Sequence, residues 1–152
     1  MLKVKIGDVR HENVIELLHE HHQDMLSHSP VESVHALDIK ALEQPDITFW
    51  SFWLNDVLAG IVALKELSHT HGEIKSMRTS QAFLRQGIAA SMLTYVIDQS
   101  NKRAYRKLSL ETGTMQAFTP AHKLYQKYGF EVCEPFADYQ YDPYSLFMSK
   151  TL

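Results

Sequence analysis

The chain has 152 residues, 45% of them hydrophobic, which is enough for one globular domain spanning residues 1–152 with a substantial core. Its formal net charge of −3 argues against a nucleic-acid-binding protein that works through a broad basic face. No apolar run is long enough to cross a membrane, and the single cysteine, Cys133, excludes an internal disulfide. We therefore expect a cytoplasmic protein with neither a nucleic-acid nor a membrane partner.

The N-terminal part predicts one strand followed by two helices. Apolar residues alternate with lysines over residues 2–6, which predicts a strand with one buried face. Helical spacing of apolar residues over 12–27 predicts an amphipathic helix, whose stripe includes either His21 or His22. A second, shorter helix is expected over 34–42.

The middle of the chain predicts three antiparallel strands in succession. A β-branched and aromatic run over 47–54, the turn Asn55-Asp56 and an apolar run over 57–64 form a predicted hairpin. A further strand is expected over 72–79. The aromatic residues expected mainly in the core are Trp50, Phe52 and Trp53.

The C-terminal half alternates helices and strands. A helix should begin near Ile88 and a strand should contain Leu108 and Leu110. Thr119-Pro120 predicts a helix start, with Thr119 as the capping residue, and Gly129 predicts a left-handed helix end. Two closing strands are expected over 130–133 and 145–149. Together these elements predict an α/β fold with a mixed, mostly antiparallel central sheet flanked by helices.

The segment from Leu84 to Ala90 turns from a loop directly into the helix that begins near Ile88. The first backbone N–H groups of a helix have no partner within the helix, and the helix dipole places partial positive charge there. Gly87, Ala89 and Ala90 are small, so a pyrophosphate can approach closely. The loop alone is weak evidence for a phosphate site.

Two motifs together resemble the GCN5-related N-acetyltransferase (GNAT) family. The loop 84–89 is similar to the family pattern Gln/Arg-x-x-Gly-x-Gly/Ala, and the segment 121–130 resembles its Ala-x-x-Leu-Tyr-x-x-x-Gly-Phe helix end. The resemblance covers essentially the whole chain, and segments such as 72–78 are similar to a bacterial branch labelled YsnE-like. Two positions depart from the pattern: Leu84 replaces Gln or Arg, and Phe118 stands where many relatives carry asparagine.

This resemblance implies the acyl-CoA N-acyltransferase fold, with acetyl-CoA as cosubstrate and no metal. Backbone amides of the loop would hold the diphosphate, and the strand edge at residues 77–79 would pair with the pantetheine arm. A backbone N–H near Arg78 would polarise the thioester carbonyl. The implied cofactor-binding residues are Met77, Arg78, Thr79, Leu84, Arg85, Gln86, Gly87, Ile88, Ala89 and Ala90.

The resemblance also implies the residues that move protons. An alkylammonium acceptor must lose a proton before it attacks, and Glu73 is the first candidate base. Glu111 is a second candidate, either as base or as substrate anchor. Tyr125 is the candidate acid for the departing thiolate. The plain structural alternatives are a surface glutamate at 73, a loop-capping carboxylate at 111 and a core aromatic at 125.

The acceptor site is less specified by the sequence. His22 and His35 are expected to line it, because the first two helices form one of its walls in the family. Lys75 and Arg78 are candidates for meeting an anionic acceptor. The C-terminal aromatic segment either shapes this site or forms the face of a homodimer. The histidines around residue 20 do not have zinc-protease spacing, since Gln23 stands where the second histidine is required.

The sequence therefore favours an N-acetyltransferase that moves the acetyl group of acetyl-CoA to a small-molecule amine or an amino acid. The acceptor would attack directly within a ternary complex. Two alternatives stay open: a protein or peptide acetyltransferase, and a CoA-binding sensor without turnover.

Overall fold

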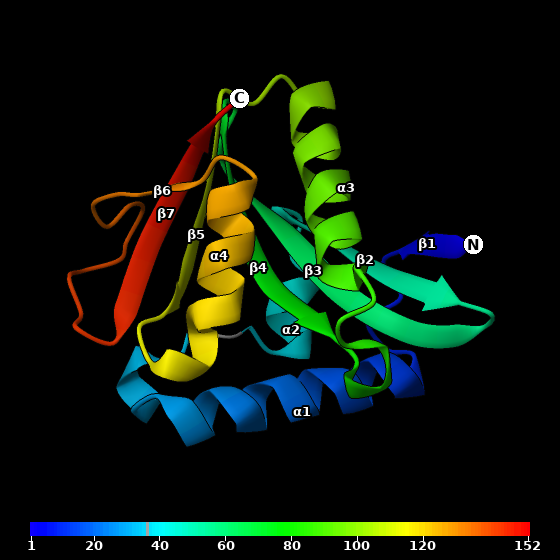
Figure 1. Cartoon of the computed structure of the whole chain (residues 1–152). Helices are drawn as coiled ribbons and strands as arrows, with labels where there is room; N and C mark the ends of the chain where they lie inside the picture. Colours follow the sequence, from blue (N-terminus) through cyan, green and yellow to red (C-terminus); the bar gives the residue numbers. More distant parts are fainter. Residues whose placement is uncertain (36) are drawn as a thin grey trace.

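A seven-stranded sheet forms the centre of the computed structural model, which describes residues 1–35 and 37–152 (Figure 1). The strand order is β1-β2-β3-β4-β5-β7-β6. Only β4 and β5 pair in parallel, and the other neighbouring pairs are antiparallel. This confirms the mixed, mostly antiparallel sheet expected from the sequence. The strands are β1 (Leu2–Ile6), β2 (Ile47–Leu54), β3 (Val57–Ser68), β4 (His71–Thr79), β5 (Lys107–Gly113), β6 (Glu131–Val132) and β7 (Ser145–Thr151).

Helices cover both faces of this sheet (Figure 1). Apolar residues of α3 and α4 pack on one face, and those of α1 and α2 pack on the other. Alternation along β2 serves both layers, because Trp50 faces α3 whereas Phe49 and Trp53 face α1. The helices are α1 (Glu12–His28), α2 (Ile39–Leu42), α3 (Ile88–Lys102) and α4 (Thr119–Lys127), with 3₁₀ turns η1 (Val31–Ser33), η2 (Gln81–Phe83) and η3 (Gln116–Phe118).

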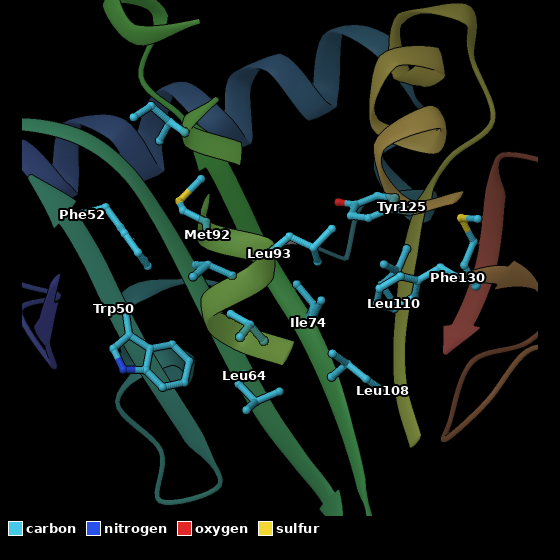
Figure 2. Packing of buried hydrophobic residues seen from close by; sticks show 14 of the residues in the cluster. Trp50, Phe52, Leu64, Ile74, Met92, Leu93, Leu108, Leu110, Tyr125 and Phe130 are labelled. Atoms are coloured by element: carbon cyan, nitrogen blue, oxygen red, sulfur yellow. The ribbon is translucent and has the colours of Figure 1, made fainter. Parts of the chain in front are cut away.

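The larger core lies between the sheet and the pair α3 and α4 (Figure 2). Met92 and Leu93 of α3 are completely buried against residues of β3, β4 and β5. Trp50 and Phe52, both expected in the core, are at most 2% exposed. This packing fixes where α3 begins, and hence where the loop before it lies.

Three local expectations are wrong. β1 does not bury one face, since Ile6 is 70% exposed; it is the edge strand of the sheet, paired only with β2. The second helix begins at Ile39 rather than residue 34, because the Asp38 side chain caps it by accepting a bond from the Ala41 amide (2.8 Å). Ala36, within the expected helix, lies outside the described residues. Thr119 is not a cap but the first helical residue of α4, with Phe118 at the cap position.

A bulge in β4 opens the sheet in its middle. On β3, Ile61 pairs with Arg78 and Ala63 pairs with Lys75, so Ser76 and Met77 together lie opposite Val62. Ser76 has a left-handed backbone, with φ of 53°. Pairing of β4 with β5 ends at Ile74 and Leu110, although both strands continue. The two strands diverge beyond that point, with α4 beside the opening (Figure 1).

Candidate active site

The loop before α3 is exposed and presents backbone amides to open space. Gly87 caps the helix with a left-handed backbone (φ 80°), and a Cβ added there would meet no atom within 4 Å. Leu84, Arg85, Gln86 and Gly87 are all exposed. Among the described residues, no backbone carbonyl accepts a bond from the amides of residues 85–90, and the helical bonds of α3 begin where the Ser91 amide donates to the Gly87 carbonyl. These amides are therefore free to bind an anion.

A groove of about 860 Å³ runs from this loop along β4 and between α1 and α4. Met77, Arg78 and Thr79 line it from β4, while Leu84 and Arg85 line it from the loop. Ile88, Ala89 and Ala90 lie at the start of α3, where Ile88 is buried and the two alanines are partly exposed. Five of the ten predicted cofactor residues therefore line the groove, and the other five, residues 86–90, follow directly in the loop and the first turn of α3.

The opening between β4 and β5 holds a smaller interior cavity of about 130 Å³. Glu73 of β4, Glu111 of β5 and Tyr125 of α4 all line it. The structure therefore brings together the three residues that the sequence singled out for proton transfer, although they come from three separate elements.

A third hollow, of about 440 Å³, lies on the other side of this cavity and forms a vestibule. His35, Glu73, Lys75 and Tyr139 line both the cavity and the vestibule. The vestibule carries more acidic than basic side chains: Glu32, Glu73, Asp138 and Asp142 against Lys65 and Lys75.

Glu73 is the centre of a buried polar network. Its side chain is 3% exposed, and its Oε2 accepts bonds from Tyr139 Oη (2.6 Å) and Lys75 Nζ (3.2 Å). Lys75 Nζ also donates to Tyr139 Oη (2.8 Å). Burial, the charge of Glu73 and the bond to it raise the pKa of Tyr139, so this phenol stays protonated. The surface-glutamate alternative for Glu73 is therefore wrong.

Glu111 and Tyr125 differ from Glu73 in their environment. Burial raises the pKa of Glu111 to about 7, with the charge of Glu73 adding to the shift and Lys75 opposing it. Burial also raises the pKa of Tyr125 to about 12, and Glu111 contributes. Tyr125 belongs to the apolar core as well as to the cavity; Figure 2 shows its hydroxyl turned away from Phe130.

The histidines lie differently from the expectation. His22 is exposed and outside the cavity, whereas its neighbour His21 is 7% exposed and lines both the cavity and the groove. Helical spacing had left both positions open, and in the structure His21 is the one that continues the buried stripe of Val14 and Leu18. His35 does line the cavity, with its ring edge-on to Tyr139 at 5.0 Å between centroids.

Lys75 and Arg78 were candidates for binding an anionic acceptor, but each is paired with a carboxylate of the chain itself. Arg78 donates to Asp24 (2.6 Å) and approaches Glu20 (3.5 Å), both on α1. Lys75 is paired with Glu73. Sequence reasoning gave no role to the contact between Tyr139 and Glu73, because the two residues are 66 positions apart.

One part of the C-terminal aromatic segment lies at the cavity, and another part is exposed. Tyr139 lines the cavity and Phe136 packs against it, with 5.2 Å between their ring centroids. Tyr141 is 81% exposed and Tyr144 is 40% exposed.

Within the described residues, no three His, Cys, Asp or Glu side chains are grouped so as to hold a metal ion. Over the same residues, each helix is too short or too polar to cross a membrane.

Comparison with known proteins defines the class. The acetyltransferase (GNAT) family matches residues 12–130. Uncharacterized N-acetyltransferase YsnE of Bacillus subtilis strain 168 is 53% identical over 151 residues, which cover 99% of this chain and 100% of that protein. Uncharacterized N-acetyltransferase YedL of Escherichia coli K12 is 49% identical over 152 residues, covering 100% of this chain and 96% of that protein.

Solved structures show the same fold. A putative acyl-CoA N-acyltransferase from Klebsiella pneumoniae superposes with a TM-score of 0.81 at 24% identity, covering 100% of this chain and 98% of that one. A GNAT family acetyltransferase from Elizabethkingia anophelis, solved with acetyl-CoA bound, gives a TM-score of 0.71 at 20% identity, covering 99% and 98%. The chain belongs to the GNAT family, and it is an acetyl-CoA-dependent N-acetyltransferase with YsnE and YedL among its relatives.

Proposed function

We propose that this enzyme transfers the acetyl group of acetyl-CoA to the amine of a small molecule or amino acid, by direct attack in a ternary complex. One observation carries the proposal: the groove and the vestibule meet the same interior cavity, and the groove's own lining residues are distinct from the vestibule's. Two substrates can therefore be bound at once, with their reacting ends in a shared space.

The groove takes coenzyme A. The free amides of residues 85–90 hold the diphosphate, and exposed Arg85 adds a positive charge that the neighbouring Leu84 cannot supply. Beyond Ile74, β4 has no strand partner on its β5 side, so Met77 to Thr79 offer a free edge to the amides of the pantetheine arm. The Arg78 side chain is occupied by Asp24, which leaves its backbone as the group that meets the cofactor.

The vestibule takes the acceptor. Its excess of carboxylates attracts an ammonium group, and the cavity of about 130 Å³ beyond it admits a small amine end. A peptide substrate would have to thread a side chain or terminus past Tyr139 and His35, so we favour a small acceptor.

Glu73 is the proposed base. Both of its hydrogen bonds reach Oε2, which leaves Oε1 for the acceptor amine or for a water molecule that bridges to it. Glu111 is the alternative base, and its pKa of about 7 suits proton transfer near neutral pH. Because Glu73 is the centre of the hydrogen-bond network at the cavity, we keep it as the base and assign Glu111 to anchoring the acceptor.

Tyr125 is the proposed acid. The neutral amine attacks the thioester carbon and a C–N bond forms, while the attacking nitrogen loses one proton to Glu73 Oε1, directly or through the bridging water. The C–S bond breaks as the thiolate departs, and Glu73 later releases its proton to solvent. The thiolate then takes a proton from Tyr125, which regains one from solvent after the products leave. Burial keeps this phenol protonated until the thiolate forms beside it.

Free-thiol release from acetyl-CoA, measured against a panel of amines, amino acids and lysine peptides, tests the proposal. We expect turnover with one or more small amines and none above the enzyme-free blank with peptides. Turnover confined to peptides would support protein acetylation. Release no faster than the blank with every acceptor, despite calorimetric binding of CoA, would support a sensor.

We further propose that the enzyme works in the cytoplasm, where it would find acetyl-CoA and where the single thiol of Cys133 would stay reduced. Exposed Tyr141 and Tyr144 are the residues we would examine first for a homodimer face.

A further inference from the structure

The passage between the cofactor groove and the interior cavity is formed by five shared lining residues. Four of them have apolar side chains and come from α1, β4, η3 and α4, and the fifth is His21. The apolar four are Met25, Met77, Phe118 and Ala121. His21 is therefore the one shared lining residue whose side chain can form a hydrogen bond to a group passing through this neck.

His21 is buried, and its side chain has an unsatisfied hydrogen-bonding atom. Its side chain sits on the apolar stripe of α1, and Nδ1 is buried with no partner among the described residues. A buried polar atom without a partner is costly and calls for an explanation. Replacing the residue by leucine would continue the stripe of Leu17 and Leu18 without that cost.

The two ring nitrogens of His21 lie in different surroundings. Neither has a hydrogen-bond partner among the described residues, but only Nδ1 is fully buried. Nε2 is therefore not fully buried, and because His21 lines both the cavity and the groove, we infer that Nε2 faces the neck between them. An orphaned N–H is rarer in proteins than an orphaned acceptor, which favours the tautomer with the proton on Nε2. In that form His21 presents an N–H to the neck.

Several charged groups surround this ring. Arg78 from β4 and Asp24 and His22 from its own helix act on it, and burial outweighs all of them. Together burial and Arg78 lower the pKa of His21 to about 4. The imidazole is thus neutral at physiological pH and cannot act as a proton store in that range.

We propose that His21 Nε2–H donates a hydrogen bond to the thioester carbonyl oxygen of acetyl-CoA and stabilises the negative charge that develops there. This inference rests on the proposed function, since it places the thioester in the neck, between the diphosphate loop and Glu73. A neutral donor held rigidly in an apolar passage needs no reorganisation when the oxyanion forms. The backbone N–H of β4 near Arg78 would be the second donor to the same oxygen.

The test compares His21→Leu with His21→Gln in steady-state kinetics, using whichever amine the panel identifies. Loss of one oxyanion donor typically costs about 10²- to 10³-fold in kcat. We expect His21→Leu to lower kcat by about 100-fold with less than a threefold change in KM for acetyl-CoA. His21→Gln, whose amide N–H can reach a similar point, should recover part of the loss.

The matched control is His22→Leu, at the exposed neighbouring position, which should leave both constants unchanged. Thermal unfolding separates function from folding: His21→Leu should be as stable as the parent or more so, since it removes an orphaned polar atom. The ratio of parent to His21→Leu kcat should stay constant from pH 6 to 9, because the ring does not titrate there.

Three results would overturn the inference. The first is a kcat for His21→Leu within twofold of the parent. The second is a rise in KM for acetyl-CoA that accounts for the whole loss in kcat/KM, which would make His21 a ground-state contact. The third is a ratio that changes across pH 6 to 7. Calorimetric binding of CoA to His21→Leu tests the groove separately, so the proposed function can stand even where this inference fails.

Discussion

The two halves of this active site are built from different parts of the chain. The proposed cofactor half is one stretch of consecutive backbone, from the end of β4 through the loop to the start of α3, and the donors that we propose for it are main-chain amides. The acceptor half is built from side chains of several distant segments, held by contacts such as that of Tyr139 with Glu73. Binding by main-chain amides depends little on which side chains are present, so a departure such as Leu84 need not abolish it. Binding by side chains depends directly on residue identity, so a substitution changes which acceptor fits. We infer that related enzymes are more alike in the cofactor that they bind than in the acceptor that they acetylate.

The strongest way to separate the halves is Glu73→Gln. An amide cannot accept the amine proton, so kcat should fall by about 10²- to 10³-fold. CoA affinity, measured by calorimetry, should not change, because Glu73 lines the cavity and vestibule rather than the groove. Glu134→Gln, at an exposed position, is the control. Retained turnover would shift the base to Glu111.

Glu111→Gln should change the pH dependence of the free energy of unfolding. The folded pKa of about 7 lies above the ordinary value of 4.5, so the folded chain holds this proton more tightly than the unfolded chain. That contribution to stability is fully present below pH 4.5 and is lost as the pH rises through 7.

Urea unfolding of Glu111→Gln at two pH values measures this effect. At pH 8 the variant should be more stable than the parent by up to about 3 kcal/mol, and at pH 4 the difference should shrink toward zero. Glu131→Gln, on the exposed edge strand β6, should show no such pH dependence. A stability difference that does not depend on pH would contradict the raised pKa.

Gly87→Ala tests the cofactor half alone. The new methyl would stand where the diphosphate approaches, so the dissociation constant for CoA should rise about tenfold, part of it from left-handed backbone strain. Gly7→Ala is a close control, because Gly7 has φ of 78° and equally open space around its Cα, yet lies outside the groove. Both variants should lose similar stability in thermal unfolding. If Gly87→Ala and Gly7→Ala bind CoA with equal affinity, the loop at Gly87 does not contribute to CoA binding.

The smallest expected effect is that of Tyr125→Phe. The variant keeps the ring that packs in the core and loses only the hydroxyl, so kcat should fall about tenfold, by more than KM for acetyl-CoA rises. Tyr128→Phe, at the C-cap of the same helix, is the control. An unchanged kcat would leave Tyr125 as a core residue.

The sequence predicted the fold well, because the fold depends largely on local patterns, and the cofactor half stays a prediction that rests on patterns of the same local kind. The Asn55-Asp56 turn, the loop at Gly87 and the left-handed Gly129 are each determined by a few neighbouring residues. The acceptor half depends on which distant segments meet. The bulge at Ser76, which opens the sheet, has no recognisable sequence pattern within an otherwise alternating strand. Helical spacing alone left His21 and His22 open, since they follow Leu18 by three and four residues, and the packing of α1 decides for His21.

Gly113, at the end of β5, has a consequence for the acyl group that the enzyme can accept. A Cβ at this position would lie 2.3 Å from the Phe118 ring, and Phe118 forms part of the neck. Any side chain at residue 113 must displace the Phe118 ring. Such a displacement would change the width of the neck through which, in the proposed function, the acyl group reaches the acceptor. We infer that the choice between acetyl and longer donors depends on a residue that has no side chain of its own.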